Sequence, residues 1–186
     1  STYHLNLTVQ TQHIPEVAEG NIEIPIINGG FETGDHSDWT ISQTAALLSL
    51  NPDVNTSGLN GESPYSGSYM SRAYIDPAAV PTSAGSGTET ITYSQIIGYN
   101  AKAGDKISLR FNSLSFNQGS NKTHKPEITA TIYGRESGGS FTQISSSVIQ
   151  NRYIDFWEQN SLVAQTDSDI DEIQIEFEIT HYWVYD

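Results

Sequence analysis

Regular alternation of apolar and polar residues is the strongest pattern in this sequence. In residues 173–180, Ile, Ile, Phe and Ile alternate with Gln, Glu, Glu and Thr, and residues 107–112 and 128–133 show the same alternation. A period of two places successive side chains on opposite faces of a β-strand. Each of these three stretches is therefore predicted to be a strand with one buried face and one wet face.

Turn-forming residues separate the alternating stretches. Asn, Gly and Ser gather at residues 28–30, 83–87 and 137–140, and such clusters are typical of the turns between strands. No segment of about twelve residues has a convincing helical period. The sequence therefore predicts an all-β fold, a two-sheet antiparallel β-sandwich or jelly roll. Residues 1–25 are predicted to be a leading strand or a linker, and residues 26–186 the domain itself.

Composition agrees with one folded β domain. Ser, Thr, Asn and Gln make up 62 of the 186 residues, and isoleucine is more frequent than leucine; such residues suit turns and pleated strands. The hydrophobic fraction of 36% is too high for a disordered acidic tail. A chain of this length buries about 70% of its unfolded surface, which is enough for a real core.

The charge balance excludes several partners. There are 22 acidic and 8 basic side chains, with a net charge of -14, and the basic residues are scattered. Nucleic acids and anionic membranes require clustered Lys and Arg, so we expect neither as a partner. No apolar run approaches the roughly 20 residues of a membrane helix, so we expect no membrane insertion. The absence of cysteine excludes disulfides and thiolate metal sites.

Four short motifs occur in an order that resembles a known family. They are residues 26–40 (IINGGFETGDHSDWT), 64–70 (PYSGSYM), 93–97 (YSQII) with 103–105 (AGD), and 182–186 (YWVYD). Together they resemble galactose-binding-like jelly rolls, in particular carbohydrate-binding modules of families four, nine and twenty-two. The family continues beyond the last motif with a second Asp. The resemblance implies a jelly roll that binds carbohydrate, and a chain that is cut from a longer protein and attached to further domains.

The resemblance also implies a structural calcium ion. In the family, the Glu of the Phe-Glu motif and the terminal Asp hold calcium, which corresponds to Glu32 and Asp186 here. Calcium takes six to eight oxygen ligands, so two carboxylates from distant parts of the chain suit it. The alternative is that Glu32 caps a turn and Asp186 is a frayed end. The acidic run 167–172 lacks the glycine of an EF-hand loop and is predicted to be a solvated turn.

Sugar binding requires aromatic platforms and planar hydrogen-bonding groups on an accessible face. If the Ile107 and Ile128 faces are core, then alternation directs a second set of side chains outward. The candidate sugar-binding residues are Arg72, Tyr74, Arg110, Asn112, Tyr133 and Glu178. The alternative is an ordinary strand surface, on which such residues need no explanation. Trp39 and Trp157 are interpreted as core or rim packing.

Catalytic motifs are absent from the sequence. The five histidines have no metalloprotease spacing, and there is no nucleophile elbow or phosphate loop. A pair of carboxylates from distant strands, as in a glycosidase, is the remaining catalytic alternative. We therefore expect a non-catalytic carbohydrate-binding module of a larger secreted or cell-surface protein, with a neutral glycan as its partner. The alternative is a structural or protein-interaction domain without a sugar site.

Overall fold

The computed structural model describes residues 3–8, 21–23, 26–44, 50–58, 61–75, 85–117, 127–150 and 154–185. Within these ranges the chain forms only strands, connected by turns and loops. The strands are β1 (Tyr3–Thr8), β2 (Asn21–Glu23), β3 (Thr40–Gln43), β4 (Leu50–Asn55), β5 (Met70–Ile75), β6 (Gly85–Ala101), β7 (Lys106–Asn117), β8 (Glu127–Arg135), β9 (Thr142–Gln150), β10 (Ile154–Gln165) and β11 (Ile170–Tyr185). The described residues thus include no helix that could cross a membrane.

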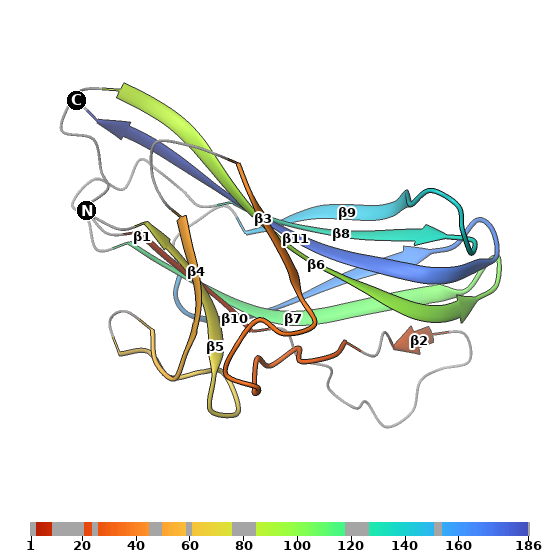
Figure 1. Ribbon diagram of the computed structural model, residues 1–186, viewed down its shortest axis with the longest axis horizontal. Coiled ribbons are helices and arrows are strands. Elements are labelled where there is room, and N and C mark those ends of the chain that lie inside the picture. The colour runs from red at the N-terminus through yellow and green to blue at the C-terminus, as the bar shows by residue number, and fades with distance from the viewer. Residues whose placement is uncertain are drawn as a thin grey trace.

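The strands form two sheets that pack face to face (Figure 1). One sheet has six strands, in the order β10-β7-β1-β5-β4 with β2 beside β7, and the other has the order β3-β6-β11-β8-β9. Neighbouring strands are antiparallel, except that β2 runs parallel to β7. The all-β, two-sheet antiparallel sandwich predicted from the alternation is therefore confirmed.

Alternation separates the core from the surface as the sequence predicts. On β11, Ile173 and Phe177 are buried, whereas Glu178 is exposed. On β7, Phe111 faces the same interior, and its ring lies 4.7 Å from that of Phe177, centroid to centroid. Burial of one such side chain contributes roughly 2 kcal/mol. The core therefore lies between the inner faces of the two sheets and leaves two outer faces available for function.

The first strand is part of the larger sheet. β1 lies between β7 and β5, with Leu5 opposite Ser115 on one side and Ala73 on the other. Residues 3–8 are thus integral to the sandwich, whereas most of residues 9–25 lie outside the described ranges. The predicted turn at residues 83–87 is wrong in its second half, because residues 85–87 extend β6 and pair with β11.

The motif at residues 26–40 is held on the sandwich by side-chain hydrogen bonds. Gln95, on β6, accepts the backbone N–H of Ile27 at 2.8 Å and donates to the carbonyls of Ile27 at 2.8 Å and Asp38 at 3.0 Å. Trp39 is buried, as predicted, and its indole N–H donates to the carbonyl of Asn28 at 3.2 Å. Two of the sequence motifs are thus joined by one glutamine.

Candidate functional site

Three of the candidate residues share the outer face of the six-stranded sheet. Arg110 and Asn112 alternate along β7 with core residues. Thr8 of β1 lies opposite Asn112, and Asn6, two residues away, lies opposite Arg72 of β5. Residues two apart on a strand face the same way, so the register places Arg72, Arg110 and Asn112 together. Tyr74 follows Arg72 on β5, but its side chain lies outside the described part of the structure.

Residues 56–58 and 61–69, between β4 and β5, cover part of this outer face, and we call them the covering loop. Its Ser57 carbonyl accepts a hydrogen bond from Nη1 of Arg72 at 2.9 Å. Its Ser63 carbonyl accepts one from the indole of Trp157, on β10, at 2.9 Å. Arg72 is accordingly only 7% exposed, and Asn112 is 2% exposed, although the alternation directs both outward.

Arg72 is committed to an internal ion pair. Its Nε donates to Oδ1 of Asp53, on β4, at 2.7 Å, and its Nη2 donates to Oδ2 of the same carboxylate. Such a two-pronged pair is among the stronger hydrogen-bonded arrangements in proteins. Because the guanidinium is also bonded to the covering loop, it stabilises the fold and does not offer a free group to a ligand. No pattern in the sequence identifies Asp53 as its partner.

The other two candidates lie on the opposite surface of the sandwich. Tyr133, on β8, is paired with Gln174, and Glu178, on β11, is paired with Thr129. The Tyr133 hydroxyl donates to Oε1 of Glu176 at 3.3 Å, and its burial, with that carboxylate beside it, raises the pKa of Tyr133. Packed sheets are about 10 Å apart, so the structure divides the five candidates whose side chains it describes between two surfaces and does not bring them into one site.

Glu32 acts as a cap for backbone N–H groups. Its carboxylate accepts the N–H of Ser68 at 3.0 Å and the N–H of Tyr69 at 3.2 Å. A Cβ at Gly67 would lie only 2.2 Å from Oε1 of Glu32, so glycine permits this close approach. Asp186 lies outside the described residues, and among the described residues no group of three metal-ligating side chains occurs. The calcium site therefore stays a prediction, and the geometry shows the turn-capping role.

An exposed aromatic cluster, which the sequence interpretation missed, lies at the edge of the six-stranded sheet. The ring centroids of Tyr65 and Trp157 are 6.1 Å apart, with the planes at 70°. Tyr65 is 46% exposed, and Phe156, on the edge strand β10, is 64% exposed. We call Tyr65 and Trp157 the aromatic edge. Phe156 and Trp157 are neighbours in one strand and face opposite ways, so at least one aromatic ring had to leave the core, and this signal could have identified the edge.

Polar side chains continue from the aromatic edge along β10. Gln159 and Ser161 are exposed and lie on the same face of the strand as Trp157, and Ser161 pairs with the exposed Arg110 of β7. A row of aromatic, amide and hydroxyl groups thus follows β10, and the guanidinium of Arg110 lies beside its end on β7. Such a surface can bind a polar ligand by ring stacking and hydrogen bonding.

A serine–histidine contact lies beneath the same sheet. Nε2 of His36 is 2.9 Å from Oγ of Ser71. Burial lowers the pKa of His36, and the carboxylates of Asp53 and Asp35 oppose this shift only in part. Ser71 is fully buried, so a substrate could not reach its hydroxyl. The pair is therefore a packing contact and does not provide an accessible nucleophile.

No protein-family model and no curated protein matches the chain. Among solved structures, the enzymatically active domain of tailspike protein 4 of bacteriophage CBA120 is 16% identical, with a TM-score of 0.55 over 84% of this chain and 20% of that chain. The present chain thus spans about a fifth of that tailspike chain, with which it shares a fold. TmCBM61, solved in complex with β-1,4-galactotriose, is 13% identical, with a TM-score of 0.48 over 84% of this chain and 91% of that one. The Stig cyclase Fisc from Fischerella sp. TAU is 16% identical, with a TM-score of 0.48 over 88% of this chain and 98% of that one.

Proposed function

We propose that this chain is a non-catalytic glycan-binding module and that it binds a neutral glycan at the aromatic edge. The observation that carries the proposal is the Tyr65–Trp157 pair, in which Tyr65 is exposed, Trp157 is partly exposed, and the indole N–H is fixed by the Ser63 carbonyl. The C–H faces of sugar rings pack on aromatic rings. A platform that is held in place before binding loses less conformational entropy when the ligand arrives.

The polar row beyond the platform supports an extended ligand. Gln159, Ser161 and Arg110 are exposed and supply amide, hydroxyl and guanidinium groups. Sugar hydroxyls need both donors and acceptors, and these three side chains offer both. Because the row follows one direction along β10, an oligosaccharide fits it better than a compact ligand does.

The charge of the chain supports a neutral glycan. With 22 acidic and 8 basic side chains, the field around the protein repels polyanions. One exposed arginine in the polar row does not reverse this field. In the proposed setting, the module belongs to a larger secreted or cell-surface protein and keeps it on a polysaccharide. A calcium ion held in part by Glu32 would then have a structural role.

An array of neutral and anionic glycans tests the proposal. We expect wild-type protein to bind neutral oligosaccharides and to ignore polyuronates and sulfated glycans. Tryptophan fluorescence should change on titration with an oligosaccharide that binds, because Trp157 lies in the platform. Absence of binding to every glycan, with calcium present, would contradict the proposal.

A structural or protein-interaction domain without a sugar site is the second candidate. The observation that favours it is the burial of Arg72 and Asn112 on this face, with Arg72 bonded to the covering loop, because neither side chain is open to a sugar. A folded protein that binds no glycan on the array would support this alternative. Glycan binding that depends on Tyr65 would exclude it.

A further inference from the structure

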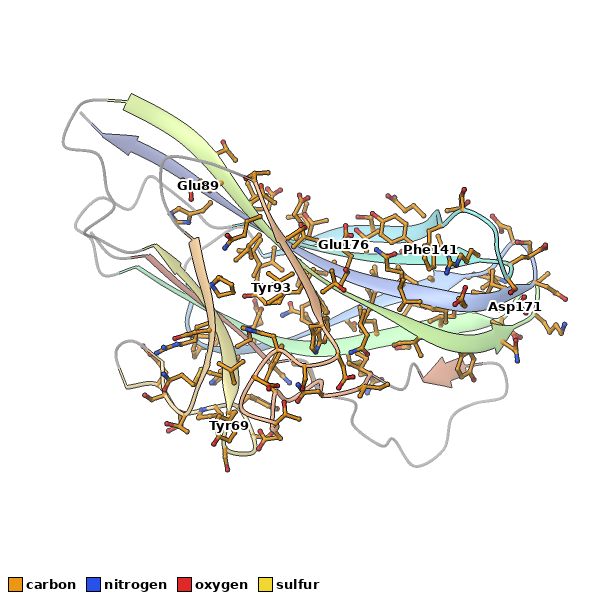
Figure 2. The ribbon with its side chains drawn as sticks, in the orientation of Figure 1. Tyr69, Glu89, Tyr93, Phe141, Asp171 and Glu176 are labelled. Atoms are coloured by element: carbon orange, nitrogen blue, oxygen red, sulfur yellow. The ribbon has the colours of Figure 1, made fainter. Side chains whose placement is uncertain are left out.

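The far end of the sandwich contains a cavity of about 350 Å³, a volume within the range of small-molecule sites. It opens between the β8–β9 turn, residues 136–141, and the β10–β11 turn, residues 166–169. Phe141 and Asp171 are labelled at this end in Figure 2, away from Tyr69 of the covering loop. Nine residues of β10 and its continuation separate Trp157 from Thr166, or about 30 Å of strand. We call this cavity the end pocket.

The floor of the end pocket is apolar. It consists of Gly134 with the side chains of Ile144 and Ile170, which are partly or fully buried. A Cβ at Gly134 would lie 2.7 Å from Cδ1 of Ile144 and 3.0 Å from Cδ1 of Ile170. The two isoleucines therefore pack directly onto the bare backbone of Gly134, and the floor is a close-packed surface.

The rim consists of polar side chains that have no partner within the part of the chain described. They are Glu136, Ser140, Thr142, Gln143, Asp167 and Ser168. Polar groups just outside the pocket are, in contrast, committed. Asp169 bonds to Nζ of Lys102 at 2.7 Å, and Oδ2 of Asp171 accepts the N–H of Ser137 at 2.9 Å. The six uncommitted side chains named above thus all line the cavity.

Arg135 supplies a guanidinium to the pocket lining, and its charge is neutralised. Nε of Arg135 donates to Oε2 of Glu172 at 2.6 Å, and Nη1 donates to the Gly139 carbonyl at 3.4 Å. The same guanidinium lies 4.2 Å from the centre of the Phe141 ring. Two free carboxylates, an amide and three hydroxyls therefore set the chemistry of the rim, and they favour a ligand that donates several hydrogen bonds and carries no negative charge.

We propose that the end pocket is a second ligand site, which takes one neutral monosaccharide unit, with its C–H face on the Gly134–Ile144–Ile170 floor and its hydroxyls on Glu136 and Asp167. The choice of a saccharide rests on the proposed glycan-binding function, whereas the site shares no residue with the aromatic edge. Carboxylates accept hydrogen bonds from sugar hydroxyls and repel anionic sugars, so the pocket discriminates against uronic acids.

Titration of ¹⁵N-labelled protein with D-galactose, D-glucose, D-mannose and D-glucuronate tests the inference by NMR. We expect at least one neutral sugar to shift the amide signals of Gly134, Gly139 and Ser168 with a dissociation constant of about 1–10 mM, as for a small ligand with few contacts. D-Glucuronate should bind at least about tenfold more weakly. No shift of these amides by any neutral sugar at about ten times that concentration would overturn the inference, as would equal binding of D-glucuronate.

Matched variants locate the binding. Asp167→Asn should weaken the neutral sugar about tenfold, and Ser168→Trp, at an exposed turn position, should block the pocket with an unchanged melting temperature. Glu178→Gln removes a carboxylate from the exposed face of β11, about 26 Å of strand away from Ile170, and should leave the titration unchanged. Tyr65→Ala should also leave it unchanged. Monosaccharide binding that survives both pocket variants would overturn this inference and leave the proposed function untouched. Polysaccharide binding that survives Tyr65→Ala would count against the proposed function and leave this inference untouched.

Discussion

The two outer faces of this sandwich arise from the same alternation of residues but differ in what lies over them. On the six-stranded sheet, Arg72 and Asn112 are buried, and Arg72 pairs with Asp53 and bonds to the covering loop. On the five-stranded sheet, Tyr133, Glu176 and Gln174 bond to one another along the surface. A period of two therefore identifies which side chains leave the core, and the long loops decide which of them reach solvent.

The largest expected difference between the two faces concerns the stability that a carboxylate contributes on each of them. Asp53→Ala leaves the buried Arg72 guanidinium without its carboxylate, and we expect a loss of about 3 kcal/mol in the free energy of unfolding. Glu176→Ala removes a carboxylate from the five-stranded sheet, where both partners stay hydrated, and should cost less than about 1 kcal/mol. Urea denaturation of the two variants measures both values. Equal losses would show that the covering loop does not shield Arg72.

A smaller effect is expected at the end of the covering loop. Glu32→Gln weakens the bonds to the N–H groups of Ser68 and Tyr69, because a carboxylate accepts more strongly than an amide does, and should cost about 1 kcal/mol. The same variant tests the calcium prediction. If Glu32 is a ligand, calcium raises the melting temperature of the wild type and not of Glu32→Gln. An identical response to a chelator in both proteins would leave Glu32 with the capping role alone.

The smallest expected effect is a pH dependence of stability that is confined to the six-stranded sheet. His36 contacts Ser71 and the rings of Phe31 and Tyr93. Burial lowers the pKa of His36 from 6.5, although the negative charge of Asp53 opposes this shift. Below pH 6.5 the unfolded chain binds a proton that the folded chain resists, so stability falls as the pH falls through this value.

Hydrogen exchange measures this dependence for each strand. Below pH 6.5, β5 should exchange faster relative to its intrinsic rate, while β8 of the five-stranded sheet changes less. His36→Gln keeps a hydrogen-bonding group near Ser71 and should remove the difference between the two strands. An unaltered pH dependence in His36→Gln would assign it to other titrating groups.

The sequence motifs turn out to be anchors of the fold. Gln95 ties residues 93–97 to the motif at residues 26–40 through Ile27 and Asp38, and Glu32 ties the same motif to residues 64–70. These contacts give a physical reason why the motifs occur together, and why they predicted the fold well. The same contacts show why the motifs predicted the site poorly, because the motif residues hold loops to sheets and are not available to a ligand.

The candidate site depended on information that alternation does not carry. Periodicity correctly placed Arg72, Arg110 and Asn112 on outer positions, but it could not say that β7 and β8 belong to different sheets, which separates Arg110 from Tyr133. Nor could it place Tyr65 beside Trp157, because that contact joins a loop to a strand 92 residues later. Local pattern predicts strands and faces, whereas the site requires the pairing of distant segments.

Oligosaccharide titration of two tyrosine variants tests the central claim most directly. The oligosaccharide is the neutral one that binds best on the array, and Tyr65→Ala is compared with Tyr133→Ala by isothermal titration calorimetry. Loss of one stacking ring should weaken binding by about tenfold in Tyr65→Ala, while Tyr133→Ala, on the opposite sheet, binds as the wild type does. Unchanged binding in Tyr65→Ala with loss in Tyr133→Ala would move the glycan site to the five-stranded sheet and contradict the account.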